Sequence, residues 1–173
     1  MQVWVRYGAM AGAAFAIVGI GFVGLSLFTD VPRSTWLTLN QLKGAVGFGL
    51  CALAGGLVGR RARPLREAGA AGALAGLVAG ISVPLAIYLL SFGFLDAVRQ
   101  YPFEYHDILS SDAPSARAFL ESPGGRATAT ATSLGLLPVI AIWAAVQGGL
   151  LGAGAGWLGR RWPRGSSARE ASA

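Results

Sequence analysis

The sequence predicts an all-α membrane protein in which four transmembrane helices form one bundle. Hydrophobic residues make up 54% of the 173 residues and charged residues only 13%, about half the charged fraction of an ordinary soluble domain. Four stretches carry no charge at all, namely 7–29, 44–59, 68–95 and 127–159. Within them, glycine and alanine recur every four residues, which is typical of closely packed membrane helices.

The predicted spans cover residues 6–28, 43–60, 67–95 and 129–159, because a helix needs about 20 apolar residues to cross a membrane. The first is too long for a signal peptide and lacks a cleavage site, so we expect it to be retained. The second charge-free stretch has only 16 residues. It reaches spanning length if Lys43 and Arg60 lie at opposite interfaces, with their charged ends drawn towards water.

The remaining segments are predicted to be an outer loop, residues 96–128, and a flexible cytoplasmic tail, residues 163–173, attached to a single domain over 1–162. Within the loop, "SDAPSARAFLESPGG" predicts a short interfacial helix that a Ser or Asp begins and Pro-Gly-Gly ends. The following "TATATS" marks the expected entry of the fourth span. Pro84 and Pro138 predict kinks in the third and fourth spans.

The distribution of basic residues predicts the orientation. The net charge is +6, yet the arginines flank apolar stretches, which favours a role in membrane orientation over nucleic-acid binding. The N-terminus, the second loop and the tail carry nine basic residues in 28 positions, against five in 45 for the other two loops. The positive-inside rule therefore places both termini in the cytoplasm. Six predicted orienting residues are Arg60, Arg61, Arg63, Arg66, Arg160 and Arg161.

The small residues predict where helices touch. Lipid is as apolar as leucine, so membrane helices associate through close packing of small residues, and a spacing of four places them on one helix face. The predicted packing glycines are Gly8, Gly12, Gly47, Gly55, Gly72, Gly76, Gly80, Gly148, Gly152 and Gly156. They form either a self-contained bundle or, on one face, a docking site for a partner chain.

Two short similarities raise the hypothesis of an internal duplication. "GAMAG" at 8–12 matches "GALAG" at 72–76. Two apolar stretches also end in the same Gly-Arg-Arg segment, at 59–61 and at 159–161. Two parallel hairpin repeats would be related by a rotation of about 180° about the membrane normal. The alternative is chance similarity, because glycine and alanine are abundant throughout the chain.

Little in the sequence indicates chemistry. No ionisable residue is expected well inside a span, which counts against a proton relay or a catalytic carboxylate site. Gln147 is a possible polar contact within the membrane, most simply an interhelical hydrogen bond. Glu104, His106, Asp107 and Asp112 lie close together in the outer loop, but their spacing matches no metal motif. We predict no catalytic residue, no metal site and no cofactor.

The chain resembles small four-helix bacterial integral membrane proteins of unknown function. The resemblance lies in "RYGAMAG" at the start of the first span, in the four spans, and in a Tyr-Pro segment rich in aromatic and acidic residues after the third span. It implies four helices and a bacterial inner membrane, and no catalytic residues.

The leading functional hypothesis is an accessory or interaction subunit without enzymatic activity, whose partners are membrane lipids and other membrane chains or a second copy, and not nucleic acid. The alternative is a small oligomeric transporter, channel or lipid-handling protein. An exposed glycine ladder would favour the first hypothesis, and a polar interior cavity that reaches Gln147 would favour the second.

Overall fold

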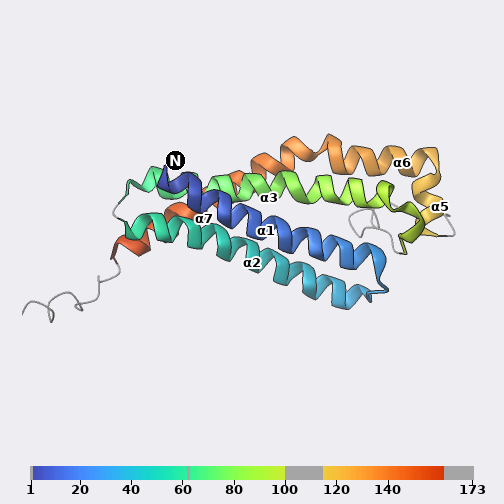
Figure 1. Cartoon of the computed structure of the whole chain (residues 1–173), viewed down its shortest axis with the longest axis horizontal. Coiled ribbons are helices and arrows are strands. Elements are labelled where there is room, and N and C mark those ends of the chain that lie inside the picture. Colours follow the sequence, from blue (N-terminus) through green and yellow to red (C-terminus); the bar gives the residue numbers. More distant parts are fainter. Residues whose placement is uncertain (1, 62, 100–114, 162–173) are drawn as a thin grey trace, which may run out of the picture.

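The computed structural model describes residues 2–61, 63–99 and 115–161, and these residues form helices and contain no strand. Three long helices are continuous: α1 (Val3–Phe28), α2 (Arg33–Arg60) and α3 (Leu65–Gly93). The fourth runs through three segments, α6 (Pro123–Thr130), the π-helix η2 (Ala131–Gly135) and α7 (Leu137–Arg161). All four are long and apolar enough to span a membrane and pack side by side (Figure 1). The predicted fold class is therefore confirmed.

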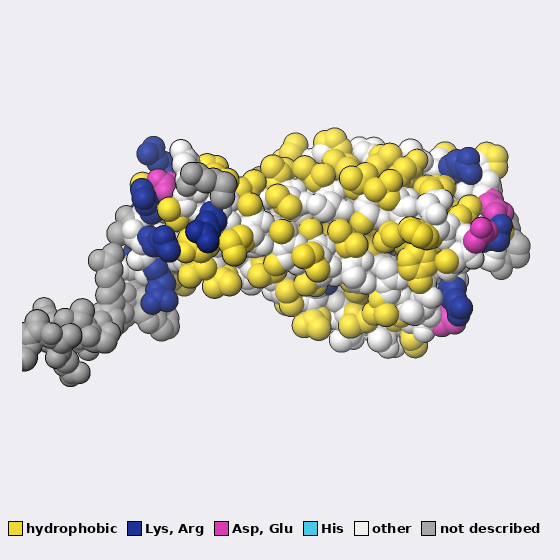
Figure 2. Space-filling view, in the orientation of Figure 1, with side chains coloured by type: hydrophobic (Ala, Val, Ile, Leu, Met, Phe, Trp, Pro, Cys, Tyr) yellow, Lys and Arg dark blue, Asp and Glu magenta, His cyan; other side chains and the backbone are white. Residues whose placement is uncertain are grey.

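The two ends of the bundle differ (Figure 1). We call one the Arg end, because the six predicted orienting arginines lie there, all of them exposed. The other, the loop end, holds the α1–α2 turn and two short helices, η1 (Leu95–Ala97) and α5 (Ala116–Glu121). An apolar surface separates the two charged ends (Figure 2), as expected for a protein that crosses a membrane.

The contacts among the helices do not follow the predicted twofold rotation. α1 packs beside α3, and α2 packs beside α7. α2 also contacts α3 across the bundle, whereas α1 and α7 have at most marginal contact. A rotation that exchanged α1 with α3 and α2 with α7 would require these two diagonal contacts to be equal. The physical reason for the difference is that the small-residue face of α7 receives both α2 and α3, which leaves α1 outside.

The two Gly-Arg-Arg segments nevertheless end together. α2 and α7 run parallel, with Gly59 against Gly156, and both helices finish at the Arg end (Figure 1). The Arg160 guanidinium donates a hydrogen bond to the Arg63 carbonyl oxygen. This contact ties the end of α7 to the turn that connects α2 and α3.

Prolines set the starts of two helices. Pro32 and Pro64 directly precede α2 and α3, and the fixed φ of proline suits this position, where no backbone donor is needed. The second helix therefore begins at Arg33, earlier than the predicted start of the second span at residue 43. In the fourth span, η2 precedes Pro138, which lacks a donor, and the Leu136 amide donates to the Ala131 carbonyl at 3.0 Å. Such π-turns accommodate a local bend.

The short helix predicted within residues 111–125 is found as α5, but Pro-Gly-Gly does not end it, because these residues lie in α6. The Ser115 hydroxyl accepts from the Ala118 amide at 3.1 Å and begins it. Ser122 ends α5 and at once caps α6, where its hydroxyl accepts from the Gly125 amide at 3.0 Å. Pro123 therefore begins the next helix, which extends the fourth span beyond its predicted start at residue 129.

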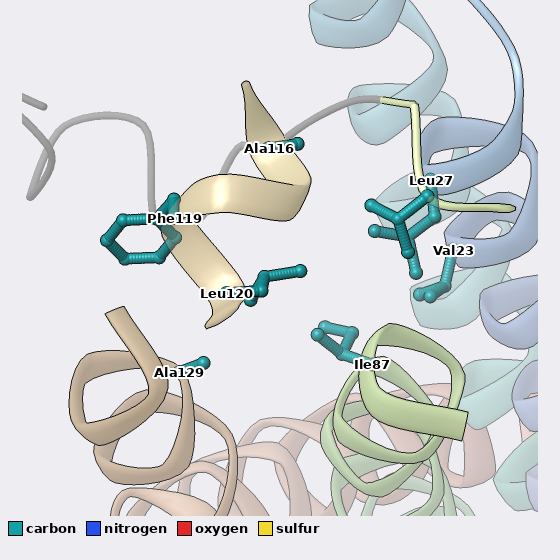
Figure 3. Packing of buried hydrophobic residues seen from close by; sticks show 8 residues of the cluster. Val23, Leu27, Ile87, Ala116, Phe119, Leu120 and Ala129 are labelled. Atoms are coloured by element: carbon teal, nitrogen blue, oxygen red, sulfur yellow. The ribbon is translucent and has the colours of Figure 1, made fainter. Parts of the chain in front are cut away.

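Large side chains fill the core at the loop end. Leu120 of α5 is fully buried and points into the space between Ile87 of α3, Leu27 of α1 and Ala129 of α6 (Figure 3). The Arg99 amide also donates to the Leu27 carbonyl at 2.9 Å. Helix α5 thus closes this end by packing its apolar side chains against α1, α3 and α6.

Candidate functional site

All ten predicted packing glycines are buried and lie against a neighbouring helix. Gly8 and Gly12 of α1 face α3, and a methyl group on Gly8 would lie 2.7 Å from the Ala71 carbonyl oxygen. Gly47 lies beneath the ring of Phe15. Gly76 and Gly80 of α3 face Ala144 of α7. The ladders therefore bring backbones of the same chain together.

Two helices, α2 and α3, converge on one face of α7. Gly152 lies between Gly55 of α2 and Gly72 of α3, and a methyl group there would lie 2.6 Å from the Ala68 carbonyl oxygen. Gly148 is similarly placed, because a methyl group would meet the backbone of Gly72 and lie 3.3 Å from the Cys51 sulfur. Only glycine fits such an approach of three backbones.

The predicted ladders are consequently turned inward. The exposed glycines Gly21, Gly49 and Gly154, which have no neighbouring atom within 4 Å, belong to none of them. The surface feature that would have favoured an accessory subunit is thus not provided by these ladders.

Towards the loop end, the bundle opens around a cavity. Helices α2 and α6 lie on opposite sides of α1 and α3 in this half (Figure 1). Near the middle of the bundle, a cavity of about 250 Å³ lies between the four spans. Its lining is Phe15 of α1, Lys43 of α2, Ala79, Gly80, Val83, Pro84 and Ile87 of α3, and Ile140 and Ala144 of α7. We call it the Lys43 cavity.

Lys43 is the one charged side chain in this lining. Its ammonium lies 4.6 Å from the centroid of the Phe22 ring, and the Phe22 ring itself lies 6.1 Å from the ring of Trp36. A cation over an aromatic face is stabilised by the negative face of the ring. The Phe22 ring of α1 therefore stabilises the ammonium, and Trp36 of α2 packs against that ring.

Lys43 lies further along its helix than predicted. It is preceded by almost three helical turns that begin at Arg33, so it lies inside α2 and not at its start. The residue is 17 positions from Arg60, about 25 Å along the helix at about 1.5 Å per residue. This length is close to the thickness of a bilayer core, and the placement of Lys43 and Arg60 near opposite interfaces stays a prediction.

Sequence reasoning missed this residue because the charge-free stretches were counted up to Lys43 and stopped there. The available signal was Pro32, whose position just before a polar but helix-compatible segment indicates an earlier helix start. The other lining residues are ordinary apolar types, and no sequence pattern distinguishes them from core residues. Pro84, predicted as a kink, lies within α3 and is buried against the cavity.

Gln147 does not take part in the site. Its side chain is half-buried, lies outside the cavity lining, and has no hydrogen bond to any described residue. The interhelical hydrogen bond expected for Gln147 is therefore not seen in the described part of the chain.

A separate ionic cluster lies at the loop end. Arg117 of α5 contacts Asp96 and Glu121, each at 2.8 Å. The hydrogen bond that the Arg117 guanidinium donates to Glu121 and the charges of both carboxylates raise the pKa of Arg117. All three side chains are largely solvent-exposed, so this cluster fixes the surface of α5 and forms no pocket for a reaction.

The predicted metal candidates Glu104, His106, Asp107 and Asp112 lie outside the described residues. Among the described residues, no group of three metal-ligating side chains comes together. Comparison with protein-family models, with curated proteins and with solved structures gives no match. The functional argument therefore depends on the geometry of the chain itself.

Proposed function

We propose that the protein is a lipid-handling membrane protein that binds a single-chain anionic amphiphile, such as a long-chain fatty acid, in the Lys43 cavity. The observation that carries the proposal is that Lys43 is the one charged residue in the lining of an otherwise apolar cavity between the four long apolar helices. The carboxylate pairs with Lys43, and the hydrocarbon chain contacts Val83, Ile87 and Ile140.

The size and access of the cavity support this class of ligand. Cavities for drug-sized ligands measure about 300–1,000 Å³, and one of about 150 Å³ holds benzene. At about 250 Å³, the Lys43 cavity suits part of one chain and not a whole phospholipid. Ile140 is 37% exposed, so the cavity reaches the outer surface of the bundle and a ligand can enter sideways from the membrane.

The electrostatics favour an anion. A charged ammonium in a medium of low dielectric constant is stabilised by a nearby opposite charge far more than it would be in water. The Phe22 ring lies against the ammonium, and Lys43 brings the one charge to the cavity lining, so a ligand with a negative charge is favoured there. An uncharged chain of the same length gains only the apolar contacts.

The test compares oleate with oleyl alcohol, which has the same chain without the charge. Native mass spectrometry of the purified full-length protein should show oleate bound at least tenfold more tightly than the alcohol, since a hydrogen bond to a charged group contributes about 1.5–3 kcal/mol. Lys43→Met should remove this preference. The matched control is Arg61→Met, which removes a cation 5.3 Å from the Tyr7 ring, outside the cavity.

Equal binding of oleate and oleyl alcohol by the parent protein would refute the proposal, as would unchanged oleate binding by Lys43→Met. The accessory-subunit hypothesis stays a prediction, to which the inward-facing ladders add no support. The Lys43 cavity is mostly apolar and does not include Gln147, so it is not the polar cavity that the sequence analysis named in favour of the alternative.

For orientation, we propose that the Arg end faces the cytoplasm of a bacterial inner membrane, because six exposed arginines gather there and the positive-inside rule then applies. With Cys51 replaced by Ala, an impermeant thiol reagent added to intact cells should label Gly124→Cys at the loop end and leave Gln2→Cys unlabelled. The opposite pattern would reverse the orientation.

A further inference from the structure

A second apolar hollow lies on the outside of the bundle at the Arg end, between α2 and α7. It measures about 320 Å³. Leu53, Gly56 and Leu57 of α2 and Ala155 and Leu158 of α7 line it, and Arg60 lies at one end. We call it the Arg60 groove. It shares no lining residue with the Lys43 cavity.

The groove follows from the way α2 and α7 approach each other. Gly55 against Gly152 and Gly59 against Gly156 bring the two backbones together on the inner side. On the outer side, Gly56 has no side chain, and a methyl group there would meet Ala155 only at 3.7 Å, an ordinary contact. Leu53 and Leu158, which are 56% and 58% exposed, form the walls. The Arg60 groove is therefore apolar and open to the outside of the bundle.

Arg60 places a positive charge at one end of the Arg60 groove. Two further arginines lie at the same end of the bundle. The Arg160 guanidinium donates a hydrogen bond to the Arg63 carbonyl oxygen, and the Arg161 guanidinium lies 3.7 Å from the Trp157 ring centroid. The salt bridges found among the described residues involve Arg117 at the opposite end of the bundle, so no described carboxylate forms a salt bridge with these three arginines.

We propose that the Arg60 groove binds one acyl chain of an anionic phospholipid, with its phosphate at Arg60. Guanidinium groups recognise phosphate through paired hydrogen bonds, and basic pockets between membrane helices bind anionic head groups. The apolar walls select a lipid over free phosphate. The excess of positive charge selects an anionic head group over a zwitterionic one. This site is independent of the proposed fatty-acid binding at Lys43.

The experiment measures lipid retained by the full-length protein in native mass spectrometry, with phosphatidylglycerol, phosphatidylcholine of the same chains, and inorganic phosphate as probes. Gly56→Leu fills the groove and keeps every arginine, whereas Arg60→Gln keeps the groove and removes the cation. Each should lower the bound fraction of phosphatidylglycerol at least fivefold. The matched controls are Gly154→Leu, which points into open space on α7, and Arg66→Gln, an exposed arginine outside the groove.

We expect the controls to bind as the parent does, and phosphatidylcholine and inorganic phosphate to bind weakly to every variant. Should Gly56→Leu fail to fold, Leu53→Trp fills the groove from its exposed wall and replaces it. Retention of phosphatidylglycerol by the filled groove, or equal retention of phosphatidylcholine, would overturn the proposal. Lys43→Met should leave phosphatidylglycerol binding unchanged, so failure of this site and failure of the Lys43 site are distinguishable.

Discussion

The Arg-end half of the bundle packs through backbones, whereas the loop-end half packs through side chains. At the Arg end, the core consists mainly of alanine, glycine, Cys51 and Val58, and three helices meet at Gly152. At the loop end, Leu27, Ile87, Phe119 and Leu120 fill the space between α1, α3, α5 and α6 (Figure 3). The Lys43 cavity lies where the packing changes, between Ala144, which packs against the glycines of α3, and Ile87 of the loop-end cluster. It is partly open to the outside of the bundle, because Ile140 in its lining is exposed.

The two halves of the bundle also have different structural roles. Backbones in contact cannot move apart without losing many small contacts at once, so the Arg-end half fixes the arrangement of α2, α3 and α7. Side-chain packing around α5 is more adjustable, and the Lys43 cavity lies at the boundary between the two halves. Substitutions in the two halves should therefore act differently.

The largest effect is expected for Gly152→Leu. The new side chain would force α2 or α3 away from α7, since even a methyl group would lie 2.6 Å from the Ala68 carbonyl oxygen. We expect no monodisperse protein in size-exclusion chromatography. Gly154→Leu, two residues away on the outer face, should elute as the parent does. A well-folded Gly152→Leu variant would contradict the packing described for the Arg-end half.

A smaller effect is expected for Leu120→Ala at the loop end. Leu120 is fully buried in the cluster beneath α5, and truncation of a buried leucine costs about 2–5 kcal/mol. We expect Leu120→Ala to lower the free energy of unfolding by about 2 kcal/mol, because neighbouring side chains around α5 can shift into the space. Hydrogen exchange should increase in α5 and α6 and stay unchanged around Gly152. Faster exchange throughout the bundle would mean that the two halves are one cooperative unit. Leu150→Ala, at a position 72% exposed, is the control.

The smallest effect is expected for Ser91→Ala. The Ser91 hydroxyl is fully buried in α3 and has no hydrogen-bond partner among the described residues. Removal of a buried unsatisfied hydroxyl should raise the free energy of unfolding by about 1 kcal/mol. A thermal unfolding measurement in detergent should show a slightly higher Tm. A clear decrease in Tm would show that Ser91 makes a hydrogen bond that stabilises the loop-end half.

The sequence predicts a feature well when only one structure is compatible with the residue pattern. A residue such as Gly72 or Gly152, repeated at intervals of four in an apolar helix, has little use except close packing, so its burial follows from spacing alone. The four spans likewise follow from length and charge. The order of the helices does not follow from length and charge. It depends on which glycine-containing faces pack together, and one face of α7 packs against both α2 and α3.

The Lys43 cavity was beyond prediction for a related reason. The position of Lys43 within α2 depends on where the helix begins. Pro32 directly precedes that start, and Trp36 in the first turns packs against Phe22 of a different helix. The cavity itself forms between Pro84 and Ala144, which are far apart in the sequence. The size of such a cavity depends on the distance between the helices, and that distance cannot be predicted from the amino-acid composition.

The central claim is that the cavity between the two halves binds an anionic chain, and photo-crosslinking tests it most directly. A fatty acid that carries a diazirine group near its carboxylate is added to the full-length protein, and the labelled residues are mapped by mass spectrometry. The account predicts labels concentrated on residues 79–87 and 140–144, with loss of this labelling on addition of excess oleate and in Lys43→Met. Labels spread evenly over outward-facing residues such as Leu150 and Trp157, unchanged by Lys43→Met, would contradict it.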